Sequence, residues 1–314
     1  MFGIIIKKLF QHSKSNTTTA DESGGGKHIP LLDGFRQLVC SCKYDDDDDE
    51  VWQKICNSMW PSTTDDPRVL GAISSFRSFY SDSFPGSAFS HRLPRQTFLS
   101  AETSSLISAV DIYYKDEVIY SKVLETETIS ETFFRNKFKV NLLGSGETTV
   151  PTPVKYNIDH GACQSLAEQN LRVSWIVIDP YNKRAINIAS HKPVRSRYTE
   201  AYRIHLTTSM TTFTVDSKLK LYHSTVATLA TGKQVQFAVK VNCGWTRREL
   251  HVKEVTVNIL GIERRGILNG RESMEILQTA MEGSRSLRID SKMDKYNYQK
   301  FRRNYKQRSP CFFL

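Results

Sequence analysis

A short apolar run in the middle of the chain, Trp175–Ile178, limits the possible folds more than any other stretch. Three of its four residues are β-branched, and Asp179-Pro180 follows at once. Proline fixes φ and cannot donate to a β-ladder. The run therefore predicts a strand buried on both faces, ending in an Asp-Pro turn.

Further strands are expected on the C-terminal side of this run, at Tyr202–Leu206, Lys220–Ala227 and Val235–Val241. The last of these alternates apolar and polar residues, as a strand with one buried face does. Thr231-Gly232 supplies a turn before it. Together these segments predict a central sheet, arranged as a sandwich, that serves binding or assembly.

The same unit is expected to include four more strands and to carry flanking helices. The strands are predicted at Ile107–Tyr114, Glu117–Val123, Phe133–Leu142 and Leu250–Ile262, and the helices at Asp49–Met59, Pro67–Tyr80 and Glu272–Met281. A chain of 314 residues can bury one large core, so we expect one main domain with extensions. The expected organisation is a flexible extension with an acidic run over 1–48, a helical and loop segment over 49–99, a β-sandwich core over 100–283 and a basic aromatic tail over 284–314.

The net charge of +10 is concentrated in that tail. Its candidate binding residues are the cations Lys295, Lys300, Arg302, Arg303, Lys306 and Arg308, interleaved with the aromatic residues Tyr298, Phe301 and Tyr305. Cations for phosphates and rings for bases are typical of single-strand nucleic-acid binding. The same cations suit an anionic membrane surface, and a solvated, disordered tail is the third interpretation.

The last four residues, Cys311–Leu314, match the C-terminal prenylation motif, with aromatic residues in both middle positions. A polybasic stretch beside a single lipid chain is a common two-part membrane anchor. We expect no signal peptide and no transmembrane helix, because no apolar run is long enough for either. A lipid at Cys311 would therefore make the protein membrane-associated.

Catalytic and metal-binding motifs are not evident in the sequence. His160 and Cys163 could form a nucleophile pair, but a strand-edge histidine and a core cysteine are the simpler interpretation. The acidic run Asp45–Glu50 lacks the spacing of a calcium loop. Asp179 ends a buried strand, where it could be catalytic or could cap the Asp-Pro turn. We expect no enzyme activity, no metal and no cofactor.

Residues 100–266 resemble the plant-virus cell-to-cell movement proteins of the thirty-kilodalton superfamily, of the negative-strand RNA virus type. The resemblance rests on a strand ending in Asp179, basic residues at Lys183-Arg184, and Gly232 opening a later strand. It implies a jelly-roll-like β-sandwich in which Asp179 and Gly232 are structural signature residues.

The resemblance also implies a function without catalysis. Such a protein binds single-stranded RNA or the viral nucleoprotein, self-associates, contacts host plasmodesmal proteins and anionic membrane, and carries the genome through modified plasmodesmata at the cell periphery. Two alternatives fit the same residues: a viral matrix protein, and a prenylated membrane-peripheral adaptor that binds a partner through a sheet edge.

Overall fold

The computed structural model describes residues 49–83, 88–89, 103–143, 149–155, 160–190, 192–206, 211–228, 234–246, 248–262, 266–282, 285–286 and 291–307. The chain divides into two units, residues 1–48 and 49–314, and every described residue lies in the second. The acidic residues Asp45 to Asp48 and the expected N-terminal extension therefore lie outside the described part.

The apolar run lies in the smaller of two antiparallel sheets. The strand order of this sheet is β3 (Glu117–Glu127), β2 (Ser105–Tyr114), β6 (Leu171–Asp179) and β7 (Arg184–Asn187). Trp175 of β6 faces the main core, whereas Ile176 and Ile178 occupy the opposite face. All three side chains are fully buried. The prediction of a strand covered on both faces is confirmed.

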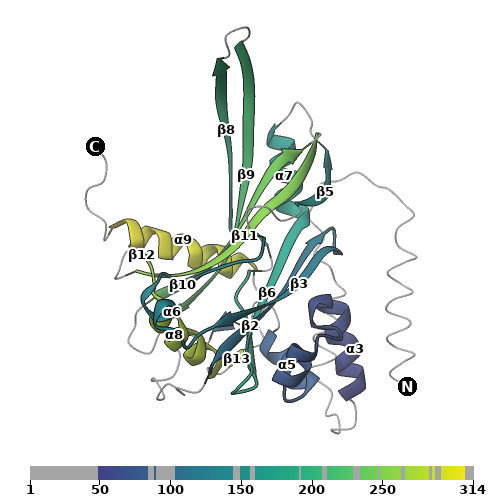
Figure 1. Cartoon of the computed structure of the whole chain (residues 1–314), viewed down its shortest axis with the longest axis vertical. Coiled ribbons are helices and arrows are strands. Elements are labelled where there is room, and N and C mark those ends of the chain that lie inside the picture. The colour runs from purple at the N-terminus through teal and green to yellow at the C-terminus, as the bar shows by residue number, and fades with distance from the viewer. Residues whose placement is uncertain are drawn as a thin grey trace. The chain divides into compact units, whose positions relative to one another are not determined.

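Short helices cover the outer face of the smaller sheet. They are α3 (Asp49–Met59), the 3-10 turn η2 (Pro61–Thr63), α4 (Pro67–Ala72) and α5 (Phe76–Ser83). Figure 1 shows α3 and α5 near β2, and η2 and α4 contact β2 directly. Buried Asp111 of β2 accepts hydrogen bonds from the amide (2.8 Å) and the hydroxyl (2.6 Å) of Ser62 in η2. The helical segment is thus attached to the sheet by hydrogen bonds between Ser62 and Asp111.

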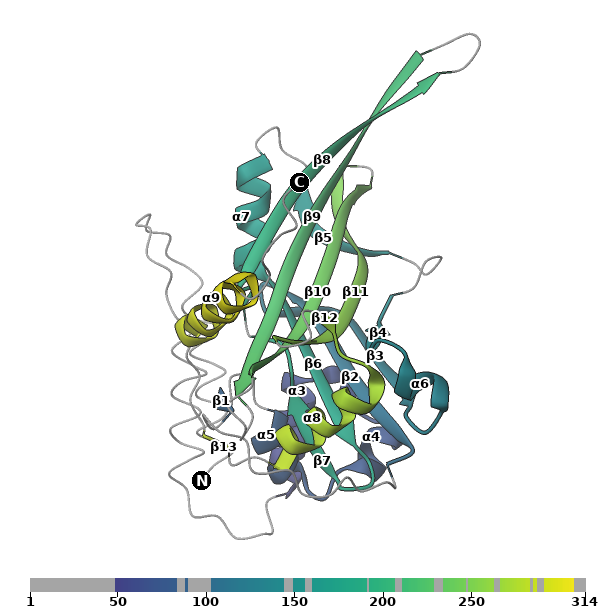
Figure 2. The same ribbon diagram turned by 90° about the vertical axis from the view of Figure 1, so that its left-hand side faces the viewer.

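The larger sheet is built on a meander of consecutive antiparallel strands. Its order is β12 (Gly266–Ile267), β11 (Glu249–Gly261), β10 (Gln234–Thr246), β9 (Thr211–Thr228) and β8 (Arg195–Leu206), and β4 (Lys139–Asn141) and β5 (Val150–Lys155) also pair with β11. Strand β9 pairs with β10 from Lys218 to Thr228, while its earlier residues pair with β8 alone. The β8–β9 hairpin therefore extends past the other strands, as Figures 1 and 2 show.

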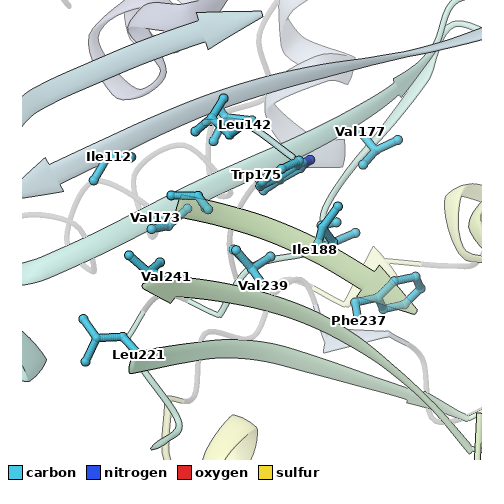
Figure 3. Close-up of a cluster of buried hydrophobic side chains, with 14 of the residues drawn as sticks. Ile112, Leu142, Val173, Trp175, Val177, Ile188, Leu221, Phe237, Val239 and Val241 are labelled. Carbon is cyan, nitrogen blue, oxygen red and sulfur yellow. The ribbon is translucent and has the colours of Figure 1, made fainter. Parts of the chain in front are cut away.

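The two sheets face each other across one apolar core. Trp175 and Val177 of the smaller sheet pack with Phe237, Val239 and Val241 of β10 (Figure 3). Each of these side chains is at most 2% exposed, and burying one such side chain stabilises a fold by about 1.5–3 kcal/mol. The fold is mainly β, with antiparallel sheets and flanking helices, as the sequence predicts. However, β6 and the strands β8 to β10 lie in opposite sheets and not in one central sheet.

Further helices complete the fold. They are α6 (Glu131–Arg135), α7 (His160–Asn170), α8 (Gly270–Glu282) and α9 (Ser291–Gln307), and the short strands β1 (Ala88–Phe89) and β13 (Arg285–Ser286) pair with each other. α9 is part of the expected C-terminal tail, and it packs against β9 and β10. A hydrogen bond of 3.2 Å from the amide of Asn304 to the side chain of Gln234 fixes its position on the sheet.

Two sequence predictions about these elements are wrong. Phe133–Leu142 is not a single strand, because Ser130 caps the helix α6 by accepting a hydrogen bond from the amide of Phe133 (3.2 Å). Pro67–Tyr80 is not a single helix either. The chain is extended at Ile73, and the Ser75 hydroxyl then accepts from the amide of Ser78 (3.2 Å) at the start of α5.

Candidate functional site

Asp179, the first residue singled out by the sequence, is a buried turn cap. Its side chain is 1% exposed and accepts hydrogen bonds from the amides of Tyr181 (3.0 Å) and Asn182 (3.1 Å) and from the Asn182 side-chain amide (2.8 Å). The Thr103 hydroxyl adds a fourth donor at 3.1 Å. With its acceptors used in this way, Asp179 supports the turn after β6, which favours the capping interpretation over catalysis. Gly232 lies outside the described residues.

The aromatic residues of the expected tail are mostly turned inward. Tyr298 is 7% exposed and Phe301 is 1% exposed, and Tyr305 stacks on Phe301 with ring centroids 6.0 Å apart. The rings of Tyr298 and Phe301 are therefore not accessible to a nucleic-acid base, which corrects the role expected for them. They attach α9 to the sheet.

The cations of α9 lie around the buried rings of Tyr298 and Phe301. Lys295, Lys300 and Arg303 are exposed, and Arg302 is half-buried with its guanidinium 5.8 Å from the Tyr305 ring. Lys306 lies in the last turn of the helix. Arg308 and Cys311 fall outside the described residues, so lipidation of Cys311 stays a prediction.

The described thiols and the described buried imidazole do not form a nucleophile site. Cys163 is 2% exposed in α7, and His160 starts that helix and not a strand edge. Burial raises the pKa of the Cys56 and Cys243 thiols to about 12, so both are protonated at neutral pH. Burial likewise lowers the pKa of His223 to about 4. In the part of the chain that the structure describes, no group of three or more His, Cys, Asp and Glu residues could hold a metal ion.

A surface that the sequence analysis did not identify lies on the outer side of the larger sheet. Leu219 and Leu221 of β9 face the core, so Lys218 and Lys220, which alternate with them along the strand, point away from it. Lys220 pairs with Arg197 of β8, and Lys240 of β10 lies one row further along the sheet. We define the outer basic face as six cations on this side of strands β8 to β11: Arg195, Arg197, Lys218, Lys220, Lys240 and Lys253.

Gly244 makes room for the last of these cations. It pairs with Lys218, and a Cβ added to it would lie 2.7 Å from Cε and 2.8 Å from Nζ of Lys253. The Lys253 side chain therefore lies directly over the Gly244 backbone, next to Lys218. A side chain at position 244 would displace it.

In the third row of the face, Arg195 lies over the ring of Tyr222, with its guanidinium 5.9 Å from the ring centroid. A cation–π contact of this kind holds the guanidinium in place while it remains exposed to solvent.

Comparison with known proteins decides the family. The chain is 34% identical over 274 residues to "F-box protein At2g27310" of Arabidopsis thaliana, an alignment that covers 82% of this chain and 72% of that protein. It belongs to the F-box protein family. It is also 35% identical to "F-box protein At3g44326" (83% of this chain, 72% of that protein) and 33% identical to "Probable F-box protein At2g36090" (75% and 63%), both from the same plant.

The other comparisons found no relatives. No family model and no solved structure matches the chain.

Membership of the F-box family overturns the expected function. The resemblance to plant-virus movement proteins is wrong, because relatives at 33–35% identity over most of the chain are plant F-box proteins. The matrix-protein and prenylated-adaptor alternatives fail on the same finding. So do the expected partners, namely single-stranded RNA, viral nucleoprotein, anionic membrane, host plasmodesmal proteins and a self-associated copy.

The expected location at plasmodesmata is likewise withdrawn. Among the described helices, none is long and apolar enough to cross a membrane.

Proposed function

We propose that this F-box protein is a substrate receptor of a Skp1-containing ubiquitin ligase. The observation that carries the proposal is the identity of 34% over 82% of the chain to a plant F-box protein. F-box proteins are associated with Skp1 and the SCF ubiquitin ligase. In this role the chain holds another protein close to the ligase.

The described fold suits a receptor. Its two sheets share one apolar core with fully buried side chains on both sides, which gives a rigid platform. The buried thiols of Cys56 and Cys243 are protonated at neutral pH, and the Asp179 carboxylate is hydrogen-bonded within its turn. We therefore propose that the chain performs no chemical step itself and that its function is binding.

The test is complex formation between the full chain and purified Skp1, followed by size-exclusion chromatography. A stoichiometric complex that elutes ahead of either protein is expected. The Arabidopsis relative At2g27310, taken through the same steps, is the positive control. If the relative binds Skp1 and this chain does not, the proposal is refuted.

A further inference from the structure

The β8–β9 hairpin leaves one edge of β9 without a neighbouring strand. Strand β10 pairs with β9 from Thr228 back to Lys218, and beyond Gly244 it pairs with β11 alone. Residues 211–217 of β9 pair with β8 and, among the described strands, with no other. Figures 1 and 2 show this end of the hairpin projecting past the other described elements. No described strand therefore supplies ladder partners for the outer backbone groups of residues 211–217.

The register of the hairpin places apolar residues on one face of this projecting end. The pairing of β8 with β9 is continuous, without a bulge, so alternate positions stay on one face throughout. Most of the projecting positions that share a face with the core-facing Leu219 hold apolar residues, namely Tyr202, Ile204, Leu206, Phe213 and Val215, with Thr211. The opposite face holds Ala201, Arg203, His205, Thr212, Thr214 and Asp216. The apolar alternation of the larger sheet thus continues past the end of the core.

The free edge of β9 lacks the protection that sheet edges normally carry. Natural edges are protected against pairing with other chains by charged residues, proline or bulges. Strand β8, at the edge of the larger sheet, has such charged residues: Arg195, Arg197, Glu200 and Arg203. In residues 211–217, by contrast, the run Thr-Thr-Phe-Thr-Val favours β structure and Asp216 is the single charged residue. Because a two-stranded ribbon is only marginally stable in water, a third strand on this edge would stabilise it.

We propose that residues 211–217 of β9 bind an extended segment of the protein that this receptor recruits, added to the hairpin as a third strand where β10 leaves β9. The inference rests on the proposed function for the occupant being a recruited protein, and on the edge itself for its chemistry. The segment supplies backbone hydrogen bonds to the free edge. It also supplies apolar side chains at alternate positions, on the face that holds Phe213 and Val215.

The length of the free edge favours a short segment over a second copy of this chain. A stable interface between two proteins takes about 20–30 residues from each side. The free edge of β9 consists of residues 211–217 alone. A single extended segment, however, can add to a sheet edge of this length, because its affinity comes from main-chain hydrogen bonds and its specificity from alternate side chains.

The experiment measures the binding of a fluorescein-labelled peptide, Lys-Thr-Val-Thr-Ile-Thr-Val-Thr-Lys, to the full chain by fluorescence anisotropy. Saturable binding is expected. Val215→Lys places a charge on the apolar face of the edge, as natural edge strands do to prevent pairing, and should weaken binding about tenfold or more. The matched control Thr214→Lys adds the same charge on the opposite face and should bind within about twofold of the wild type. Hydrogen exchange of the complex should show new protection of residues 211–217.

Four results would overturn the proposal. Equal weakening by Val215→Lys and Thr214→Lys would show that the apolar face is not recognised. Equal binding of a peptide of the same composition, with its apolar residues placed together, would show that alternation is not recognised. Protection confined to β8 would move the site to the other edge of the hairpin. Strong protection of residues 211–217 without peptide would show that the edge is already covered, by a second copy if the protection rises with protein concentration and by the chain itself if it does not.

Skp1 binding, measured on the same proteins, separates this inference from the proposed function. Val215→Lys should lose the peptide and keep Skp1, the result that supports both proposals. Peptide binding by a wild-type chain that does not bind Skp1 would refute the receptor function and leave the strand-adding ligand in place. Skp1 binding by a wild-type chain that does not bind the peptide would overturn this inference alone. A thermal melt detects unfolding of Val215→Lys, and in that event the comparison of the two peptides on the wild-type chain still decides.

Discussion

Replacing Asp111 with alanine should loosen the attachment of the N-terminal helices to the smaller sheet. The Asp111 carboxylate is fully buried and accepts three hydrogen bonds, from the Ser62 amide (2.8 Å), the Ser62 hydroxyl (2.6 Å) and the Ser121 hydroxyl (2.5 Å). The alanine variant leaves these donors without an acceptor. It also leaves a cavity the size of the missing carboxyl group.

The expected loss in the free energy of unfolding follows from the hydrogen-bond donors that are left without an acceptor. A buried donor left unpaired costs about 1–3 kcal/mol. The Ser62 amide is held in place by the backbone, so its loss of a partner costs the full amount, whereas the two serine hydroxyls can rotate towards other acceptors. We therefore expect a loss of about 2–5 kcal/mol in the free energy of unfolding, a large share of the 5–15 kcal/mol typical of a domain. Asp111→Asn keeps a carbonyl for the Ser62 amide and should lose only about 1 kcal/mol.

The pH dependence of this site has a definite sign. Burial raises the pKa of the Asp111 carboxyl above its ordinary value. Between the ordinary pKa and the raised one, the folded protein holds more protons than the unfolded chain, so stability falls as pH rises. The asparagine of the Asp111→Asn variant does not titrate, so it lacks this pH dependence. The advantage of the wild type over Asp111→Asn should be greatest below the ordinary carboxyl pKa and should shrink as the pH increases.

Urea unfolding followed by tryptophan fluorescence measures the loss, and Trp60, 2% exposed next to η2, reports on the helices. Hydrogen exchange should show the amides of η2 and α4 opening before those of β6. An Asp111→Ala protein as stable as the wild type, to within about 0.5 kcal/mol, would refute the idea that this carboxylate attaches the helices to the sheet.

Three further substitutions test other parts of the fold. Asp179→Ala should lower the free energy of unfolding in urea by about 2–4 kcal/mol, because the turn after β6 loses its cap. Phe301→Ala should cost about 3–5 kcal/mol and make α9 sensitive to limited proteolysis, whereas Tyr296→Ala, at a position 54% exposed, should leave cleavage unchanged. His223 has a folded pKa of about 4, below its unfolded value of about 6.5, so the unfolded chain binds the extra proton and stability should rise by about 3 kcal/mol between pH 4 and pH 6.5. A His223→Gln variant that kept this pH dependence in urea titrations would contradict the assignment to His223.

The parts of the fold that the sequence predicts correctly are those whose pattern reflects their surroundings directly. Trp175–Ile178 is apolar at consecutive positions because β6 is covered on both faces. Val235–Val241 alternates because the core-facing residues of β10 alternate with residues on the opposite face of the sheet. In both cases, local sequence and burial carry the same information.

The role of α9 could not be predicted from its sequence pattern alone. Tyr298, Phe301 and Tyr305 recur at helical spacing among cations, a pattern that fits both a single-strand binder and an amphipathic helix. Only the presence of β9 and β10 beneath the helix decides between them. The outer basic face was missed for a related reason: its members come from separate strands, and only the register of pairing brings them together.

The mistaken family assignment has a physical origin as well. An aspartate at the end of a buried strand is favoured wherever the next amides need an acceptor, as the amides of Tyr181 and Asn182 do here. Such a residue reflects local turn chemistry, which many unrelated β-proteins share. A few residues of this kind therefore cannot identify a family.

The order of the strands along the chain has a consequence for synthesis on the ribosome. Strands β2, β3, β6 and β7 are made before the meander β8 to β11, yet the inner face of β6 is covered by β10. Translation at about 5–20 residues per second leaves roughly 3–13 s between the emergence of Trp175 and that of Val241. During that interval the apolar inner face of β6 is exposed to solvent, so the nascent chain should depend on chaperones that bind this face until β10 has been made.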